Sequence, residues 1–219
     1  MEYYENNLIN SEFHTTPFIH RKYKLFSDGL CNELIENFRI MKNYMTKSSG
    51  ISQSRFMICI TGDTINGINY GNYSFLKEIS PINNILLEYN NKILPRLNNV
   101  YGYQGNIKYQ INLVYDTKNY EIGPHTDSYN RRITNIVYLV PINDYGKKLG
   151  VSLYKDLINR HQDKWEKTHY SFENFEKIDE VPYYSGSSID FKVSKNSFHG
   201  VKSIEENCER MSIQSIIWN

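Results

Sequence analysis

Residues 107–140 read IKYQINLVYDTKNYEIGPHTDSYNRRITNIVYLV, and they hold two predicted strands with a polar motif between them. The first part, 107–115, alternates between the two sides of an extended chain, which is typical of a half-buried strand. One side of this strand carries Tyr109, Ile111, Leu113 and Tyr115. The last part, 133–140, is rich in β-branched residues, which favours a second strand.

Further strand patterns follow toward the C-terminus, at 151–154, 187–193 and 210–218. Few helical patterns separate them, whereas a parallel sheet needs a crossover, usually a helix, between successive strands. The sequence therefore predicts an antiparallel sandwich or barrel rather than a parallel α/β sheet.

The N-terminal part has helical periodicity instead. Ser27 and Asp28 can cap a helix that continues to about Met45, and a second helical region covers roughly 73–98, with a break at Pro81. We expect one domain over 1–219. In this division, 1–106 forms a helical support with the first strands, and 107–219 forms the β core. A charged and aromatic insert at 155–180 is expected to be a short helix or a long loop.

Composition excludes several classes of protein. The chain has 25 Lys and Arg against 24 Asp and Glu, and a net charge of +1 provides no basic surface for a nucleic-acid partner. The three cysteines are odd in number and lack metal-site spacing, which favours a reducing compartment. Residues 1–20 are polar, and no apolar run is long enough to span a bilayer. We therefore expect a cytoplasmic protein without a membrane partner; the sequence does not indicate an oligomeric state.

Two short motifs contain side chains that bind metals. His125 and Asp127 are two residues apart, so they project from the same side of an extended backbone. His199 follows 74 residues later (199 − 125). A His-x-Asp pair or a single His often occurs by chance. The order His-x-Asp and then a distant His is the pattern of a 2-His-1-carboxylate site, which leaves three metal positions open.

A candidate anion site lies in the last predicted strand. Arg210, Ser212 and Gln214 alternate onto one face, 11 residues beyond His199 (210 − 199). A guanidinium beside a hydroxyl can bind a carboxylate with charge-assisted hydrogen bonds. The simpler alternative is an arginine on a solvated strand face. The short distance in sequence to His199, a candidate metal ligand, favours the anion site over this alternative.

Taken together, GPHTD at 123–127, SFHGV at 197–201 and RMS at 210–212 resemble the Fe(II)- and 2-oxoglutarate-dependent oxygenases, particularly the small prolyl-hydroxylase-like branch. The resemblance covers about half of the chain. It implies a mainly β fold with N-terminal helices and a double-stranded β-helix core of the cupin-like, jelly-roll type. It also implies that His125, Asp127 and His199 bind iron.

The resemblance further implies that Arg210 and Ser212 bind the distal carboxylate of 2-oxoglutarate. By position, Tyr115 and Tyr138 match tyrosines that contact this cosubstrate. Because the chain has 19 tyrosines, core packing is an equal alternative for both. Arg131 and Arg132 follow the first motif and could contact an anionic substrate, or form a solvated pair in a loop. His161 and His169 are more simply explained as surface or substrate-facing residues than as metal ligands.

The implied activity is that of a dioxygenase using Fe(II), 2-oxoglutarate and O₂. It would hydroxylate a C–H bond of a small molecule or of a carrier- or peptide-linked residue, with succinate and CO₂ as coproducts. One alternative is a protein hydroxylase of the prolyl or asparaginyl type. Another is a non-catalytic jelly-roll module that binds a ligand. Halogenases of the family carry Gly or Ala where this chain has Asp127, so halogenation is not expected.

Overall fold

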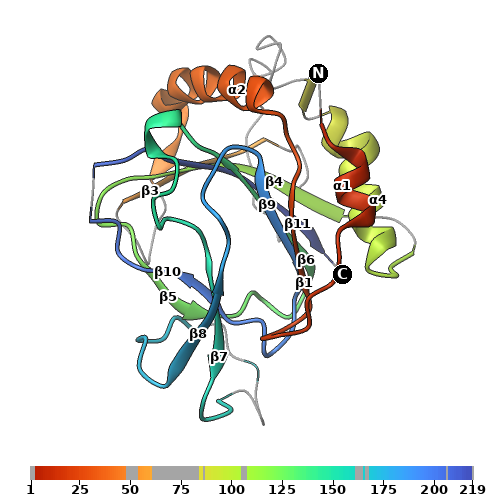
Figure 1. The fold of residues 1–219 in the computed structure, drawn as a ribbon, viewed down its shortest axis with the longest axis vertical. Coiled ribbons are helices and arrows are strands. Elements are labelled where there is room, and N and C mark those ends of the chain that lie inside the picture. Colours follow the sequence, from red (N-terminus) through yellow and green to blue (C-terminus); the bar gives the residue numbers. More distant parts are fainter. Residues whose placement is uncertain are drawn as a thin grey trace.

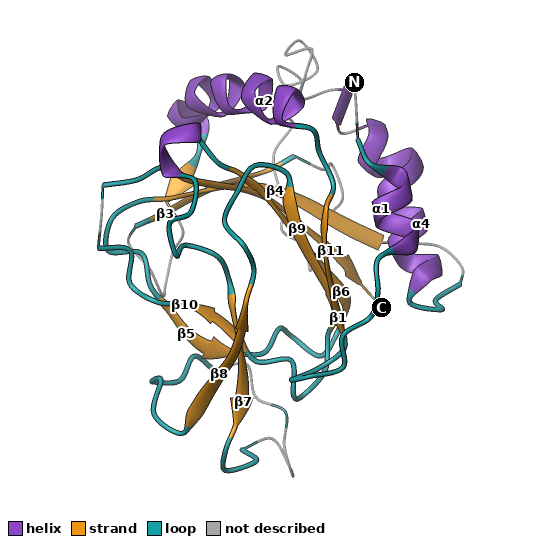
Figure 2. Cartoon of the chain, viewed as in Figure 1, coloured by secondary structure: helices purple, strands orange, loops and turns teal. Residues whose placement is uncertain are grey.

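Two antiparallel sheets pack face to face in the computed structural model, and helices cover the outer face of the larger sheet (Figures 1 and 2). The structure describes residues 3–47, 54–60, 84–85, 87–104, 108–160, 165, 168–205 and 207–218. Within them, no helix is both long and apolar enough to cross a membrane. The predicted antiparallel β core with N-terminal helices is confirmed.

The larger sheet has seven strands, all paired in antiparallel fashion. Their order is β1 (His20–Lys24), β9 (Ser187–Lys192), β6 (Arg131–Leu139), β11 (Arg210–Trp218), β4 (Lys108–Asp116), β3 (Arg55–Cys59) and β2 (Thr46–Lys47). The smaller sheet has the order β5 (Ile122–His125), β10 (His199–Val201), β7 (Ser152–Asp156) and β8 (Phe175–Glu180). Strands of the N-terminal part thus complete the same sheet as the C-terminal core.

The helical elements of the described residues come mostly from the N-terminal half. They are α1 (Glu5–Asn10), α2 (Asp28–Met41), η1 (Lys42–Tyr44), the π-helix η3 (Tyr89–Ile93), α4 (Leu94–Val100) and the short η4 (Ile142–Asp144). Ser27 caps α2 as predicted, because its Oγ accepts a hydrogen bond from the Leu30 N–H at 3.3 Å. The helix ends four residues before Met45, where the chain tightens into the 3₁₀ turn of η1.

The predicted second helical region is borne out where the structure describes it. Helical backbone covers 84–85 and 87–100, including η3 and α4; the rest of the predicted region, 73–83 with Pro81, lies outside the described residues. Pro95 is the second residue of α4, directly after the π-helix η3, and it has no N–H to donate to the preceding turn.

The alternation of β4 separates two cores. Ile111, Leu113 and Tyr115 share one face, as predicted, and this face packs with residues of α2 and α4. A second core lies between the sheets and contains Tyr138 of β6 and Leu153 of β7. The opposite side of β4 therefore faces this inner space, and it carries Asn112 and Asp116, both buried.

The expectation for 155–180 was wrong at both of its ends. Lys155 and Asp156 complete β7, and 175–180 form β8, which pairs with β7. The strand was not recognised because its sequence, FEKIDE, is mostly charged. A strand at the edge of a sheet exposes one side to solvent and carries charge at little cost. The connection proper is 157–174.

Candidate metal centre and cosubstrate pocket

The pairing of β5 with β10 brings the two histidine motifs together. His125 is the last residue of β5, His199 is the first of β10, and the two are direct cross-strand partners. Their imidazole centroids lie 4.3 Å apart. With Asp127 they form a buried cluster in which one ligand atom from each residue lies within 4.8 Å of the others. The three predicted metal ligands thus meet at one point, although they come from motifs 74 residues apart.

Backbone carbonyls determine which ring nitrogen of each histidine is available. His125 Nδ1 lies 2.9 Å from the Gly123 carbonyl oxygen, and His199 Nδ1 lies 3.0 Å from that of Ser197. A carbonyl oxygen can only accept, so each Nδ1 carries the proton and each Nε2 keeps a free lone pair. This is the usual support of a metal-binding histidine. Burial, aided by the nearby His199, holds the pKa of His125 well below 6.5 and keeps its ring in the neutral, ligating form.

Asp127 is held as a carboxylate by two neighbours. Its Oδ1 accepts from Arg131 Nη1 at 2.5 Å, and its Oδ2 accepts from Thr134 Oγ at 2.6 Å. Burial alone would raise the pKa of Asp127. The Arg131 charge outweighs that effect, with help from the Thr134 hydrogen bond, and the pKa of Asp127 lies below its ordinary value. Each carboxylate oxygen still has a second lone pair that can bind a cation.

A cavity of about 90 Å³ lies beside the cluster, between the two sheets. The smaller sheet contributes both histidines, and the larger sheet contributes polar side chains from several strands. Its lining residues are Arg55, Tyr120, Ile122, His125, Asp127, Thr134, Ile136, Val151, His199, Gly200, Val201, Arg210 and Gln214. The candidate metal ligands and the predicted carboxylate-binding arginine therefore share one enclosed space.

Arg210 is fully buried at the first position of β11. Its Nε donates to the Leu149 carbonyl at 2.7 Å, its Nη1 donates to Asp116, and its Nη2 lies 3.4 Å from Tyr138 Oη. Ser212 is buried on the same strand and accepts from Gln214 Nε2 at 3.2 Å. Arg210 and Gln214 both line the cavity, so the face of β11 that carries Arg210, Ser212 and Gln214 points toward the space between the sheets.

The two predicted tyrosines lie in different cores. Tyr138 lies beside Arg210 in the inner core, and its Oη also accepts from the Val151 N–H at 2.8 Å. The prediction for Tyr115 is wrong. Tyr115 faces the helices, accepts from Lys42 Nζ at 3.0 Å and donates to Glu209 at 3.2 Å. The reason is the alternation of β4, which directs odd-numbered residues away from the cavity.

The arginine pair was placed in a loop, and this was also wrong. Both residues begin β6, so their side chains leave opposite faces of the sheet. Arg131 lies next to the metal cluster, where it binds Asp127 and packs over the Trp218 ring at 5.2 Å. Arg132 packs over Tyr103 at 5.1 Å, on the side of the helices. Arg132 therefore does not line the cavity beside the metal cluster.

The connection between β7 and β8 reaches the cluster. The His169 ring lies against that of His125, with centroids 4.5 Å apart. Trp165 Nε1 donates to Thr126 Oγ at 2.9 Å, and Thr126 is the middle residue of the His-x-Asp motif. The Tyr170 N–H donates to the Pro124 carbonyl at 3.0 Å. His161 lies outside the described residues.

Sequence reasoning missed Arg55 and Tyr120, which line the cavity, and Asp116, which is buried behind it. Asp116 pairs with both Arg55 and Arg210. Tyr120 is 1% exposed, yet its hydroxyl has no hydrogen-bond partner within the described parts of the chain. A buried hydroxyl at a cavity wall without a partner is costly unless a ligand serves it. No short-range motif marks these residues, because they meet through strand pairing.

The residues present fit a metal ion and an anionic cosubstrate. Two imidazole nitrogens and one carboxylate are the donor set of a non-haem Fe(II) site. The orphaned Tyr120 hydroxyl and the guanidinium of Arg210 stand on the wall of the same cavity, where they suit a carboxylate.

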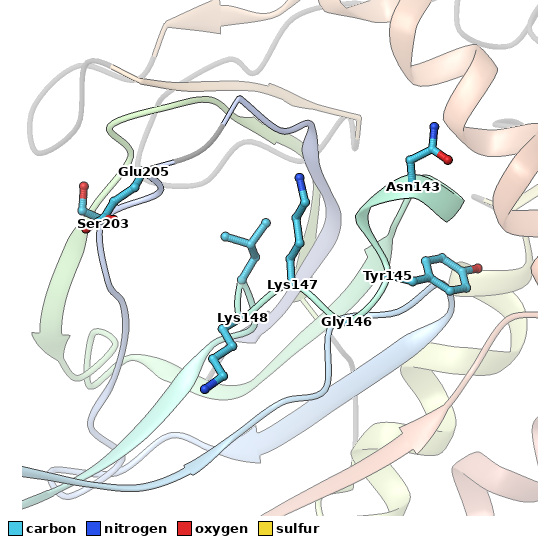
Figure 3. A pocket seen from close by; sticks show the side chains of 8 residues that line it. Asn143, Tyr145, Gly146, Lys147, Lys148, Ser203 and Glu205 are labelled. Carbon is cyan, nitrogen blue, oxygen red and sulfur yellow. The ribbon is translucent and has the colours of Figure 1, made fainter.

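A larger hollow, of about 540 Å³, lies elsewhere on the surface (Figure 3). Figure 3 shows that the side chains of Lys147 and Lys148 point in different directions, so their charges do not converge on one ligand. Lys147 is also paired with Asp144 at 2.8 Å. The smaller inner cavity is therefore the better candidate for chemistry.

No protein-family model matches the chain, and no curated protein matches it in sequence. Solved structures do resemble it. A prolyl-4-hydroxylase from Pseudomonas putida matches with a TM-score of 0.55 and 11% identity, over 98% of this chain and 96% of that one. A prolyl hydroxylase from Trichoplax adhaerens, in complex with a hypoxia inducible factor peptide fragment, matches with a TM-score of 0.56 and 17% identity, over 98% and 86%.

The epimerase SnoN, in complex with Fe³⁺, alpha ketoglutarate and nogalamycin RO, matches with a TM-score of 0.60 and 10% identity, over 98% of this chain and 82% of that one. These likenesses extend over nearly the whole of the chain, while the sequence identities are low. They establish its fold as the double-stranded β-helix of these enzymes.

Proposed function

We propose that the protein is an Fe(II)- and 2-oxoglutarate-dependent dioxygenase. It hydroxylates a C–H bond of a small molecule or of a carrier- or peptide-linked residue, and it releases succinate and CO₂. One observation carries this proposal: His125, Asp127 and His199 line the same buried cavity as Arg210. The double-stranded β-helix fold supports it, since structures of this fold include 2-oxoglutarate-dependent oxygenases.

The polar side chains that would bind the metal and the cosubstrate have separate roles in this proposal. The free Nε2 atoms of the two histidines and the Asp127 carboxylate hold the metal. Arg210 binds the distal carboxylate of the cosubstrate through charge-assisted hydrogen bonds, and the Tyr120 hydroxyl provides a neutral one. Fe(II) with bound 2-oxoglutarate supplies the oxidising chemistry, which these residues orient but do not perform.

The surroundings of the cluster favour a dry site. Four apolar side chains are among those that line the cavity, namely Ile122, Ile136, Val151 and Val201. Excluding water strengthens the charged interactions inside the cavity and limits side reactions. The ion pair with Arg131 and the hydrogen bond from Thr134 also keep the Asp127 carboxylate in one orientation.

Direct tests of the metal site use spectroscopy and product formation together. Anaerobic addition of Fe(II) and 2-oxoglutarate is expected to produce a weak visible charge-transfer band, and exposure to air is expected to yield succinate. His199→Ala is expected to remove both signals. His14→Ala serves as the control, because His14 is exposed and belongs neither to the cluster nor to the cavity lining. If the wild-type protein gives neither the band nor succinate, the proposed enzymatic function is refuted, and a ligand-binding module remains as the alternative.

The outcome of the oxidation needs its own measurement. SnoN has the same fold and is an epimerase, so the fold does not determine the product. Screening peptides and metabolites for stimulated succinate release would identify substrates. Mass spectrometry of the product then distinguishes hydroxylation, which adds one oxygen atom, from epimerisation, which leaves the mass unchanged.

A further inference from the structure

Three charged side chains form a row across neighbouring strands of the larger sheet. Asp116 at the end of β4 is the direct cross-strand partner of Arg55 on β3 and of Arg210 on β11. Arg55 binds Asp116 with two hydrogen bonds, from Nε at 2.7 Å and from Nη2 at 2.9 Å. Arg210 Nη1 donates to the same carboxylate. Both arginines line the cavity, whereas Asp116 is completely buried between them.

Arg210 retains donors for a ligand in this arrangement. A guanidinium has five N–H groups, and the hydrogen bonds to Leu149, Asp116 and Tyr138 use one each on Nε, Nη1 and Nη2. One N–H on each terminal nitrogen is left to donate to a ligand. Asp116 thus orients Arg210 without blocking it.

Orientation by Asp116 has an electrostatic consequence. A carboxylate paired with Arg210 alone would cancel its positive charge, and the cavity would attract a dianion weakly. Arg55 adds a second positive charge, so the row carries two positive charges against one negative charge. Asp127 does not alter this balance, because Arg131 is paired with it.

Tyr120, on the cavity wall, contacts both arginines of the row. The Arg55 guanidinium lies 4.3 Å from the Tyr120 ring centroid, and that of Arg210 lies 5.9 Å from it. The Tyr120 ring thus lies against both arginines, and its hydroxyl has no hydrogen-bond partner within the described residues. A ligand carboxylate here would meet one hydroxyl and a net positive charge.

We propose that Arg55 is a positioning residue for the dicarboxylate cosubstrate. It acts through Asp116: it neutralises the carboxylate that orients Arg210, so that the full charge of Arg210 remains for the distal carboxylate of 2-oxoglutarate. This inference rests on the proposed function. It assigns to Arg55 a role in cosubstrate affinity that is separate from its contribution to folding.

The test measures binding of 2-oxoglutarate to the Mn(II)-loaded protein by calorimetry, in the absence of turnover. Arg55→Met is expected to weaken the binding of 2-oxoglutarate about 10- to 100-fold, the usual range for losing a charged hydrogen-bonding partner. Mn(II) affinity should remain unchanged. Arg96→Met is the control, because Arg96 is also paired with a carboxylate, that of Glu5, on the helical side of the molecule.

A second-site variant separates charge from structure. The double variant Arg55→Met with Asp116→Asn restores one net positive charge to the row. It should therefore bind 2-oxoglutarate at least about fivefold more tightly than the single variant Arg55→Met does. The effects of the two substitutions are not additive, because both act on the same charged pair. Arg55→Gln should lose affinity as Arg55→Met does, and Arg55→Lys should retain most of it. These two variants keep a polar side chain and test the proposal if the Met variant does not fold.

Three results would overturn the proposal: unchanged affinity in Arg55→Met or Arg55→Gln, equal losses in Arg55→Lys and Arg55→Gln, or no recovery in the double variant. Each would mean that Arg55 only stabilises the sheet. If wild-type protein itself does not bind 2-oxoglutarate, the proposed function fails first, and the two failures are thus distinguishable.

Discussion

Gly123, the first residue of the GPHTD motif, lies directly beneath another part of the chain. A Cβ atom at this position would lie 1.9 Å from the carbonyl oxygen of Tyr170 and 3.1 Å from its carbonyl carbon. These are backbone atoms, so they cannot rotate away as a flexible side chain would. Gly123→Ala therefore requires the connection between β7 and β8 to move.

The size of the effect follows from these distances. Ordinary contact begins at 3.4 Å, so the Tyr170 backbone must retreat by about 1.5 Å (3.4 − 1.9). That shift breaks the hydrogen bond from the Tyr170 N–H to the Pro124 carbonyl, which is 3.0 Å long. Overpacking costs about 1–3 kcal/mol and the hydrogen bond about 1 kcal/mol, for a total of roughly 2–4 kcal/mol. For a domain of this size, the melting temperature should fall by roughly 5–15 °C.

Thermal unfolding followed by fluorescence is the assay, with Gly29→Ala as the matched control. A Cβ at Gly29, in the first turn of α2, meets nothing within 4 Å, so this variant should be neutral or slightly more stable. The charge-transfer band should persist in Gly123→Ala, because β5 and β10 still pair. A melting temperature within about 2 °C of wild type would refute the reasoning, since Tyr170 could not then cross over Gly123.

Three further perturbations have defined outcomes. Tyr138→Phe leaves the buried Val151 N–H without its acceptor, so it should lower the free energy of unfolding by about 1–3 kcal/mol in denaturant titrations; no loss would show that this hydrogen bond is dispensable. Arg21→Met leaves the fully buried Asp190 without its bidentate partner and should cost about 3–5 kcal/mol in the same assay, whereas a loss below about 1 kcal/mol would contradict a dry ion pair. The metal-free protein should lose stability as the pH falls below about 6.5, because the unfolded chain then protonates His125 while the lowered pKa in the folded state resists it. His125→Asn should flatten this slope in pH-dependent melting curves, apart from the share of His20, whose pKa is also lowered by burial; an unchanged slope would refute the assignment.

Short motifs were sufficient to identify the side chains of the cluster. His125 and Asp127 are neighbours in sequence, and the chemistry of imidazole and carboxylate is a property of the residues themselves. Arg210 was found in the same way, through its alternation with Ser212 and Gln214 on a strand. The alternating residues of β4 likewise predicted one apolar face, which is the face that packs against the helices.

Sequence reasoning failed where an answer depended on contacts between distant strands. Arg55 and Asp116 are separated by 61 positions, and no local pattern indicates that they pair. Tyr115 was assigned by its spacing from His125, but the face of a strand that lines a cavity depends on register. The strand β8 resembled a loop because its sequence is mostly charged, and its pairing with β7 across the connection 157–174 is not visible in a local pattern.

By itself, therefore, the sequence determined which residues can bind a metal and a carboxylate, and that the core is an antiparallel β structure. Tertiary structure alone decided that these groups share one cavity, that Tyr120 rather than Tyr115 stands on its wall, and that Arg55 balances the charge of Asp116. The physical reason is that ligand chemistry belongs to single side chains and alternation to single strands. The charge and orientation of a site arise only when the register between strands is set.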